Sequence, residues 1–332
     1  MIKESIADTS REPRIICIGG GTGLFSLLSG LRTNWQEAHL QAVVAMTDSG
    51  GSTGRLRDEF GTLPPGDVRQ CLVALSDAPE DLRSLMQYRF ASGGDLNGHS
   101  LGNLILTAGK KIADDEYAAI EMVERILNVR GKVYPVTLDD THLVAHLADG
   151  TVIRGETRID RPDLAPRAPI ERLSFTMPAR LFGKTGDAIL SSDAIIIGPG
   201  DLYTSVLPNL IVGGVPEALA RAQARGAKIL YVVNTMTKHG ETDGYTARAF
   251  VRRIAEAISP AKLDAVIVND GVIGEAQRIA YSRERAEPVV NDLHDKICFV
   301  YAADLVRRGE FARHDPESLA KAVRMTIARI GA

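Results

Sequence analysis

The sequence predicts an α/β fold, a Rossmann-like, doubly wound and mostly parallel sheet with an antiparallel β insertion. A short apolar run at 15–18 breaks into a glycine-rich turn, and a helical pattern follows over 24–31, which is the typical opening of such a sheet. Apolar runs then alternate with helical patterns along most of the chain. Five runs end in short loops rich in Gly, Asn, Asp, Ser and Thr, at 19–23, 47–54, 198–205, 234–244 and 269–271.

The same periodicity predicts the elements that follow the first helix. The apolar run 40–46 is expected to contain a buried parallel strand, with Val43, Val44 and Ala45 as its continuous apolar residues. Pro64-Pro65-Gly66-Asp67 marks a helix start, with Asp67 as the expected N-cap. Further helices are expected at 80–90, 101–112 and 116–127. This stretch therefore supplies a second strand and a long helical connection.

Between about 132 and 176 the pattern changes to β. Asp149-Gly150 is a hairpin signal between two alternating runs, so this region is expected to be an antiparallel insertion in an otherwise parallel fold. Its expected strands are 133–136, 142–147, 151–159 and 170–177. Four titratable residues are interpreted as a polar outer face and not as a zinc site, namely His142, His146, Glu156 and Asp160.

After the insertion the α/β alternation returns. The expected strands are 194–197, 228–233, 263–268 and 296–301. The expected helices are 216–225, 245–258, 275–283 and 316–330. Residues 14–330 are therefore expected to form one domain, preceded by a disordered tail at 1–13.

Composition narrows the class of protein. The chain has 332 residues, of which 45% are hydrophobic, so a core can form without disulfides or a metal. A formal net charge of -3 argues against a general nucleic-acid surface, and no run approaches the length of a membrane span. Cys17, Cys71 and Cys298 are far apart and odd in number, which favours buried thiols and a cytoplasmic location.

The loop Gly19–Gly23 is the first candidate ligand site. In an open α/β sheet, ligands bind outside the carboxyl ends of the strands, and helix N-termini attract phosphate. Gly20, Gly21 and Gly23 would let a phosphate approach the backbone, and Thr22 would add a hydroxyl. The loop departs from GxGxxG and lacks the lysine of a Walker A loop, so a tight turn with Thr22 as a helix cap is the alternative. Gly200 is a candidate of the same kind.

The loop after the second expected strand carries a second group of candidates. Asp48 would bind a ribose hydroxyl or hold Mg²⁺ through water, and Arg55 would pair with a phosphate. Ser49 is a hydroxyl donor. The alternative is a solvated turn in which Asp48 caps the next helix.

The polar loop 234–244 carries a third group. The amide of Asn234 offers a donor and an acceptor, which suits the edge of uracil or guanine, and Lys238 would meet phosphate. The alternative is that Thr242 or Asp243 only caps the following helix.

Four further candidates stand apart from these loops. His99 and Asn103 lie at i and i+4 on a helix start and would reach a ligand together, with His99 as acid or base; a buried structural histidine is the favoured alternative. Tyr281 and Arg313 would stack on and pair with a ligand, or lie at the surface. The sequence has no GxSxG elbow, HExxH helix or kinase signature.

Taken together, six motifs resemble the gluconeogenesis factor family, the YvcK-type proteins that bind UDP-N-acetylglucosamine. This family is related to 2-phospho-L-lactate transferase (CofD), which makes the deazaflavin cofactor F420. The similarity runs in order over roughly 14–330. Its motifs lie at 18–24, 47–57, 64–69, 98–103, 197–205 and 234–245.

The resemblance implies a cytoplasmic, Rossmann-like protein that binds a UDP-sugar and acts in carbon-source adaptation, cell shape and envelope control. It also implies that the glycine loop holds the diphosphate, that Asn234 faces the base, and that Tyr281 and Arg313 close on the ligand. Many relatives carry paired aspartates where this chain has Asp48-Ser49. One carboxylate fewer weakens the case for Mg²⁺-dependent transfer.

Three interpretations remain open. The leading one is a regulatory protein that senses UDP-N-acetylglucosamine, needs no cofactor, has protein partners in envelope regulation and pairs through a helix such as 216–225. The alternative is a 2-phospho-L-lactate transferase-like enzyme that uses a nucleotide-activated donor and Mg²⁺. In that enzyme Asp48 would hold the metal, Arg55 and Lys238 would stabilise charge on phosphate, and His99 would be a further catalytic candidate. A scaffold whose glycine loops are only turns is the third interpretation.

Overall fold

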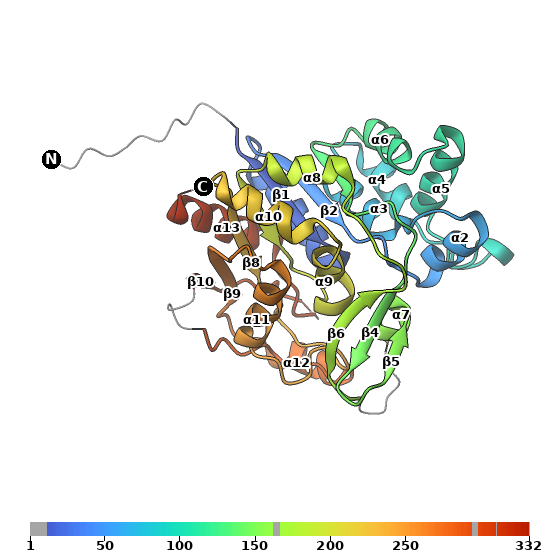
Figure 1. The fold of residues 1–332 in the computed structure, drawn as a ribbon. Helices are drawn as coiled ribbons and strands as arrows, with labels where there is room; N and C mark the ends of the chain where they lie inside the picture. Colours follow the sequence, from blue (N-terminus) through green and yellow to red (C-terminus); the bar gives the residue numbers. More distant parts are fainter. Residues whose placement is uncertain (1–11, 162–166, 294–297, 310, 332) are drawn as a thin grey trace.

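The structure, a computed structural model, describes residues 12–161, 167–293, 298–309 and 311–331 (Figure 1). The tail predicted at 1–13 lies outside these residues except for Glu12 and Pro13. No helix in the described ranges is both long and apolar enough to cross a bilayer.

The described residues contain one large parallel sheet of seven strands, which confirms the predicted α/β class. Its order is β10-β9-β8-β7-β1-β2-β3, and every neighbouring pair is parallel. The chain therefore winds outward from β1 in one direction and then returns to the other side of β1, so the switch point lies between β1 and β7. The strands are β1 Arg14–Gly19, β2 His39–Val44, β3 Lys132–Pro135, β7 Ala194–Ile197, β8 Lys228–Val232, β9 Ala265–Asn269 and β10 Phe299–Ala303.

Helices cover both faces of this sheet. Along β1, Ile15 and Cys17 belong to one hydrophobic cluster, whereas Ile16 and Ile18 belong to another. A strand buried on both faces must be apolar at every position, which explains the continuous runs in the sequence. The first face packs against α1 Gly21–Asn34, α3 Pro65–Ala74 and α13 Pro316–Ile330. The second face packs against α8 Gly183–Leu190, α10 Val215–Ala224 and α11 Ala247–Ile258.

The remaining helices follow the predicted order, and α2 to α6 gather on one side of the molecule (Figure 1). The helices predicted at 80–90, 101–112 and 116–127 are confirmed within a few residues at their ends. The remaining bounds are α2 Gly51–Phe60, α4 Glu80–Gln87, α5 Leu101–Ala113, α6 Glu116–Ile126, α9 Leu207–Leu210 and α12 Glu275–Ser282.

The predicted insertion exists as a small antiparallel sheet with the order β5-β4-β6, but two of its expected parts differ. Its strands are β4 Leu143–Leu147, β5 Val152–Arg154 and β6 Ile170–Phe175. The strand β3 is parallel to β2 in the large sheet, so the antiparallel unit begins only at β4. The single strand predicted at 151–159 is wrong, because Gly155, with φ +93°, ends β5 and starts the helix α7 Glu156–Asp160.

Two predicted helix caps are also wrong. Helix α3 begins at Pro65, and Asp67 instead accepts a hydrogen bond from the Gly21 N–H at 2.9 Å. The cap residue of α11 is Thr246. The hydroxyl of Thr242 accepts a bond from the Lys238 N–H at 2.8 Å, and Asp243 accepts one from the Gly240 N–H. In each case the side chain that was predicted to cap a helix accepts a hydrogen bond from a backbone N–H outside that helix.

Candidate functional site

A cleft of about 590 Å³ opens at the carboxyl end of the large sheet, at the switch point between β1 and β7. This volume is in the range of small-molecule sites. Its lining comes from the turns after β1, β7 and β8, from α12 with the residues that follow it, and from the segment before α13. The end of α7 brings the antiparallel insertion to the same cleft.

Many of the candidate residues from the sequence line this cleft. They are Gly20, Gly21, Thr22, Gly23, Gly200, Asn234, Lys238, Tyr281 and Arg313. The others, which lie outside the lining, are Asp48, Ser49, Arg55, His99 and Asn103. Three strand ends far apart in sequence therefore meet where the pattern of glycine and polar loops predicted.

The turn after β1 is shaped by close backbone contacts. A Cβ on Gly23 would lie 2.6 Å from the carbonyl oxygen of Pro199, so only glycine lets α1 approach the turn after β7 this closely. Gly21 has φ +61° and donates its N–H to the carboxylate of Asp67. Burial raises the pKa of Asp67 to about 6. The next N–H groups of a first helical turn have no intrahelical acceptor and remain suited to an anion.

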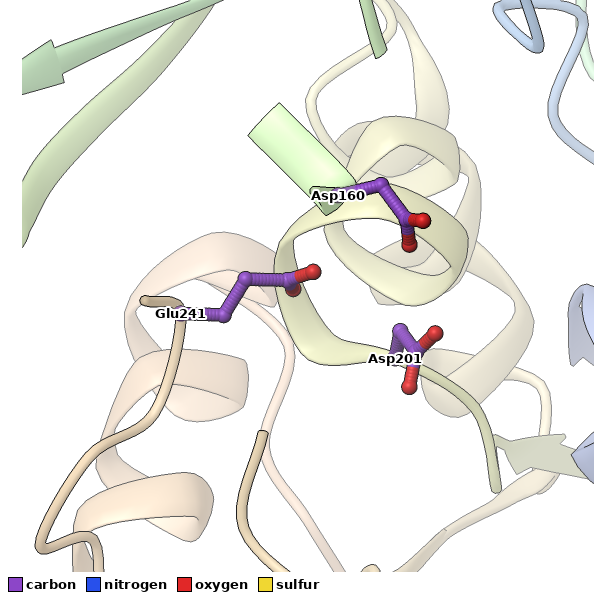
Figure 2. Close-up of side chains that lie close together, drawn as sticks. All are labelled: Asp160, Asp201 and Glu241. Atoms are coloured by element: carbon purple, nitrogen blue, oxygen red, sulfur yellow. The ribbon is translucent and has the colours of Figure 1, made fainter. Parts of the chain in front are cut away.

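One wall of the cleft is acidic. Figure 2 shows the carboxylates of Asp160, Asp201 and Glu241 turned toward one shared space, and their oxygens lie within 4.8 Å of one another. The Lys238 ammonium contacts all three, at 2.7 Å from Asp201 and 3.1 Å from Glu241. Interpreting Asp160 as part of an outer face was therefore wrong. Asp201 and Glu241 belong to two of the sequence motifs but had no predicted role. Their contacts with Lys238 are visible only in the structure.

The charges of this wall offset one another. Burial alone would lower the pKa of Lys238, but the three carboxylates outweigh burial and raise it above the usual value. Burial raises the pKa of Glu241 to about 7, against the opposing effect of Lys238. The ammonium is thus already neutralised by protein groups, and it does not stand free to meet a phosphate.

A second part of the lining, the lip, is aromatic and basic. The rings of Tyr281 and Phe311 meet edge to face at 5.9 Å, and the Arg313 guanidinium lies 5.4 Å from the centre of the Phe311 ring. Burial raises the pKa of Tyr281, and the nearby Arg313 opposes this rise. Arg283 lines the same lip. Two candidates that are separate in sequence, Tyr281 and Arg313, therefore form one surface.

Three unsatisfied polar atoms belong to residues that line the cleft. The Oδ1 atom of Asn234 and the Nε2 atoms of His239 and His314 are buried and have no hydrogen-bond partner among the described residues. Burial lowers the pKa of His314 to about 4, although a hydrogen bond to the Val233 carbonyl opposes this, so the imidazole is neutral at physiological pH. His314 was not among the sequence candidates, although it directly follows Arg313.

Asp48 and Ser49 join the loop after β2 to the insertion. Asp48 accepts a hydrogen bond from the Gly50 N–H at 2.8 Å, and burial raises its pKa. The Ser49 hydroxyl bonds the Thr157 hydroxyl and accepts from the Thr157 N–H, each at 3.2 Å. Glu156 accepts from the Ser49 N–H at 3.5 Å.

The remaining candidates have structural partners. Arg55 donates to the carbonyl of Asn97 at 2.6 Å. The Nδ1 atom of His99 lies 3.1 Å from the Ser52 hydroxyl, and the Asn103 side chain accepts from Arg69 at 2.9 Å. His99 and Asn103 are both buried, which agrees with the alternative of a structural histidine.

Replacement of Glu156 by glutamine is expected to change how stability depends on pH. Burial and the charges of Asp48 and Asp160 raise the pKa of Glu156 from 4.5 to about 8. The folded state therefore holds this proton more tightly than the unfolded state, and the free energy of unfolding falls as pH rises between these two values. Glu156→Gln removes this loss. The difference between the Tm of the variant and the Tm of the parent should therefore rise from about pH 5 to about pH 8 and stay constant above that pH.

Thermal unfolding of both proteins across that range measures the effect. Glu171→Gln, an exposed glutamate on β6, serves as the control. Parallel pH profiles for Glu156→Gln and the parent would contradict a raised pKa at this position.

Comparisons with known proteins agree on one family. The family model described as 2-phospho-L-lactate transferase CofD matches residues 15–306. The chain is similar to the gluconeogenesis factor of Bacillus subtilis, with 42% identity over 287 residues that cover 86% of this chain and 87% of that protein. It is 41% identical over 284 residues to the gluconeogenesis factor of Halalkalibacterium halodurans, with 86% of each chain covered. A crystal structure of a UPF0052 family member from Bacillus halodurans matches with a TM-score of 0.88 and 38% identity, over 95% of this chain and 99% of that one.

Proposed function

Since this chain belongs to the CofD family and, within it, to the gluconeogenesis factors, we propose that it is a regulatory protein that binds UDP-N-acetylglucosamine. The observation that carries the proposal is the cleft at the switch point. There the glycine turn after β1 and the lip of Tyr281 and Arg313 line one cavity of about 590 Å³. Such a cavity suits an elongated ligand with a phosphate group and an aromatic base.

The chemistry of the residues that line the cleft supports a nucleotide-sugar in particular. Free N–H groups at the start of α1 and the guanidinium of Arg313 would share the charge of the diphosphate. Asn234 and the neutral His314 would accept hydrogen bonds from donors on the base or ribose, which would relieve their buried and unsatisfied atoms. The acidic wall around Asp201 would accept hydrogen bonds from the hydroxyl and amide groups of the sugar.

The biological role follows from the same family membership. We place the protein in the cytoplasm, with effects on carbon-source adaptation and cell shape through partners in envelope regulation. Cys17 and Cys71 are free and buried, which is in keeping with a reducing compartment. A homodimer through the α10 face is part of this proposal.

Isothermal titration calorimetry with UDP-N-acetylglucosamine tests the proposal directly. We expect saturable binding with one ligand per chain, and no release of UDP or free sugar when the mixture is followed by chromatography. UDP alone should bind more weakly, because it lacks the sugar that would meet the acidic wall. Absence of binding heat at several temperatures, with protein that unfolds cooperatively, would remove the proposal.

The alternative is a transferase like the enzyme after which the matching family model is described. One observation favours it: the charge of Asp48 contributes to the raised pKa of Asp67, and a divalent cation between such like charges would stabilise both. Asp48 and Asp67 would hold Mg²⁺, which would offset charge on a transferred phosphate group. Formation of product from a deazaflavin acceptor, lost in Asp48→Asn, is the result that would establish the transferase.

A further inference from the structure

Lys238 lies at the centre of a group that has the composition of a divalent-cation site. Its ammonium contacts Asp160, Asp201 and Glu241, whose oxygens lie within 4.8 Å of one another. Carboxylate oxygens at this spacing are the donors that Mg²⁺, Mn²⁺ and Ca²⁺ prefer. Here the positive charge among them comes from the protein itself.

The three carboxylates belong to different parts of the fold. Asp160 ends α7 of the antiparallel insertion, Asp201 follows β7, and Glu241 shares the loop after β8 with Lys238. Because all three contact one ammonium, the insertion is held against the carboxyl edge of the large sheet. This contact forms one wall of the cleft, since Asp160, Asp201 and Lys238 all line it.

Both ends of the arrangement are held in place by other groups. The side chain of Glu241 is completely buried and accepts hydrogen bonds from the Tyr203 N–H at 3.2 Å and from the Thr204 hydroxyl at 3.3 Å. The Lys238 N–H donates to the Thr242 hydroxyl at 2.8 Å. An ammonium has three N–H donors, which matches the three carboxylates that surround it. The group is therefore a preorganised site with its cation in place.

We propose that Lys238 is an internal cation that occupies the position of a divalent metal ion in the wall of the cleft and thereby fixes the insertion against the sheet. Lys238 is then a positioning residue and not a ligand of the phosphate. This inference concerns the construction of the cleft, and it stands whichever ligand the cleft binds.

Removal of the ammonium should create a metal-dependent protein. Lys238→Ala leaves three carboxylates close together without their counterion, and the completely buried Glu241 is the one that loses most from this. A divalent cation fits the vacated space and restores the charge balance. In EDTA we expect the Tm of Lys238→Ala to fall by about 5 °C or more, and we expect Mn²⁺ to recover most of that loss. The parent should respond to Mn²⁺ much less.

Arg167 provides a matched control. Its guanidinium also joins the insertion to the loop after β8, since it donates to the carbonyl of Ile159 at 2.8 Å and to the carbonyl of Gly240 at 2.6 Å. Both acceptors are neutral, and the charge of Arg167 acts on Glu241 without an ion-pair contact. Arg167→Ala therefore removes a similar connection while the three carboxylates keep the ammonium of Lys238. We expect Arg167→Ala to lose stability that Mn²⁺ does not restore.

The decisive measurement is Mn²⁺ binding by electron paramagnetic resonance, with thermal unfolding in parallel. Lys238→Ala should bind one Mn²⁺ at least tenfold more tightly than the parent or Arg167→Ala, and the double variant Lys238→Ala with Asp201→Asn should lose this gain. If Lys238→Ala does not fold in EDTA, refolding in the presence of Mn²⁺ should recover it. Equal Mn²⁺ affinity in Lys238→Ala and Arg167→Ala, or failure of Mn²⁺ to recover an unfolded Lys238→Ala, would overturn the proposal.

Discussion

Thr22→Arg is expected to weaken binding of UDP-N-acetylglucosamine at least about 100-fold, or roughly 3 kcal/mol. Thr22 is exposed in the first turn of α1 and lines the cleft. An arginine there would extend into the space proposed for the diphosphate and cover the N–H groups that would hold it. The cost to the fold should be small, because the side chain is exposed and a cation at a helix N-terminus costs less than about 1 kcal/mol. Calorimetry gives the affinity, and circular dichroism gives the Tm.

Thr33→Arg is the matched control for this variant. Thr33 is exposed in the last turns of the same helix, far along α1 from the cleft, and a cation near a helix C-terminus is favourable. Its affinity for the UDP-sugar should equal that of the parent. If Thr22→Arg bound the ligand as tightly as the parent does, the proposed position of the diphosphate would be wrong.

Gly23→Ala is expected to destabilise the fold by about 2–3 kcal/mol and to weaken ligand binding as well. The added Cβ would lie 2.6 Å from the carbonyl oxygen of Pro199 and 3.0 Å from the nitrogen of Gly200. These atoms are backbone, so they cannot yield as the end of a flexible side chain would. Helix α1 and the turn after β7 would have to separate at the switch point. Denaturant unfolding measures the loss of stability.

Gly183→Ala provides the comparison for this substitution. Gly183 is also at the start of a helix, α8, but a Cβ there would meet no atom within 4 Å. Alanine at such a position should be neutral or stabilise by up to about 1 kcal/mol, because it restricts the unfolded chain. Equal stabilities of the two alanine variants would show that the close approach at Gly23 does not constrain the fold.

Much of the fold was predictable because burial requires a regular pattern of apolar residues in the sequence. The part of a parallel strand that is covered on both faces must be apolar, as Ile15–Ile18 of β1 and Ala42–Val44 of β2 are. An amphipathic helix repeats its apolar positions every three to four residues. The wrong prediction of one strand at 151–159 concerns a stretch where this pattern of apolar residues is weakest. Short runs on either side of Gly155 resemble one strand, and only the backbone turn at that residue separates β5 from α7.

The cleft was predictable only in part. Loops at the carboxyl ends of parallel strands must share one edge of the sheet, so the meeting of the turns after β1, β7 and β8 followed from strand order. Sequence spacing at a helix start was a poorer guide, since α5 begins at Leu101 and His99 lies before it. His99 and Asn103 have the spacing of a ligand-binding pair, but both are buried among structural partners.

The sequence by itself determined the α/β class and the glycine turn that opens the sheet, because continuous apolar runs and a strand–turn–helix pattern are features of single elements and their direct neighbours. Only the tertiary structure decided that Asp67 bonds Gly21, that Asp160 and Asp201 share the ammonium of Lys238, and that Tyr281 lies beside Arg313. The separation of these partners in the sequence runs from 32 residues, for Tyr281 and Arg313, to 78 residues, for Asp160 and Lys238. Their charges and rings leave no periodic pattern, since what brings them together is the crossing of the chain and not the local repeat of a helix or strand.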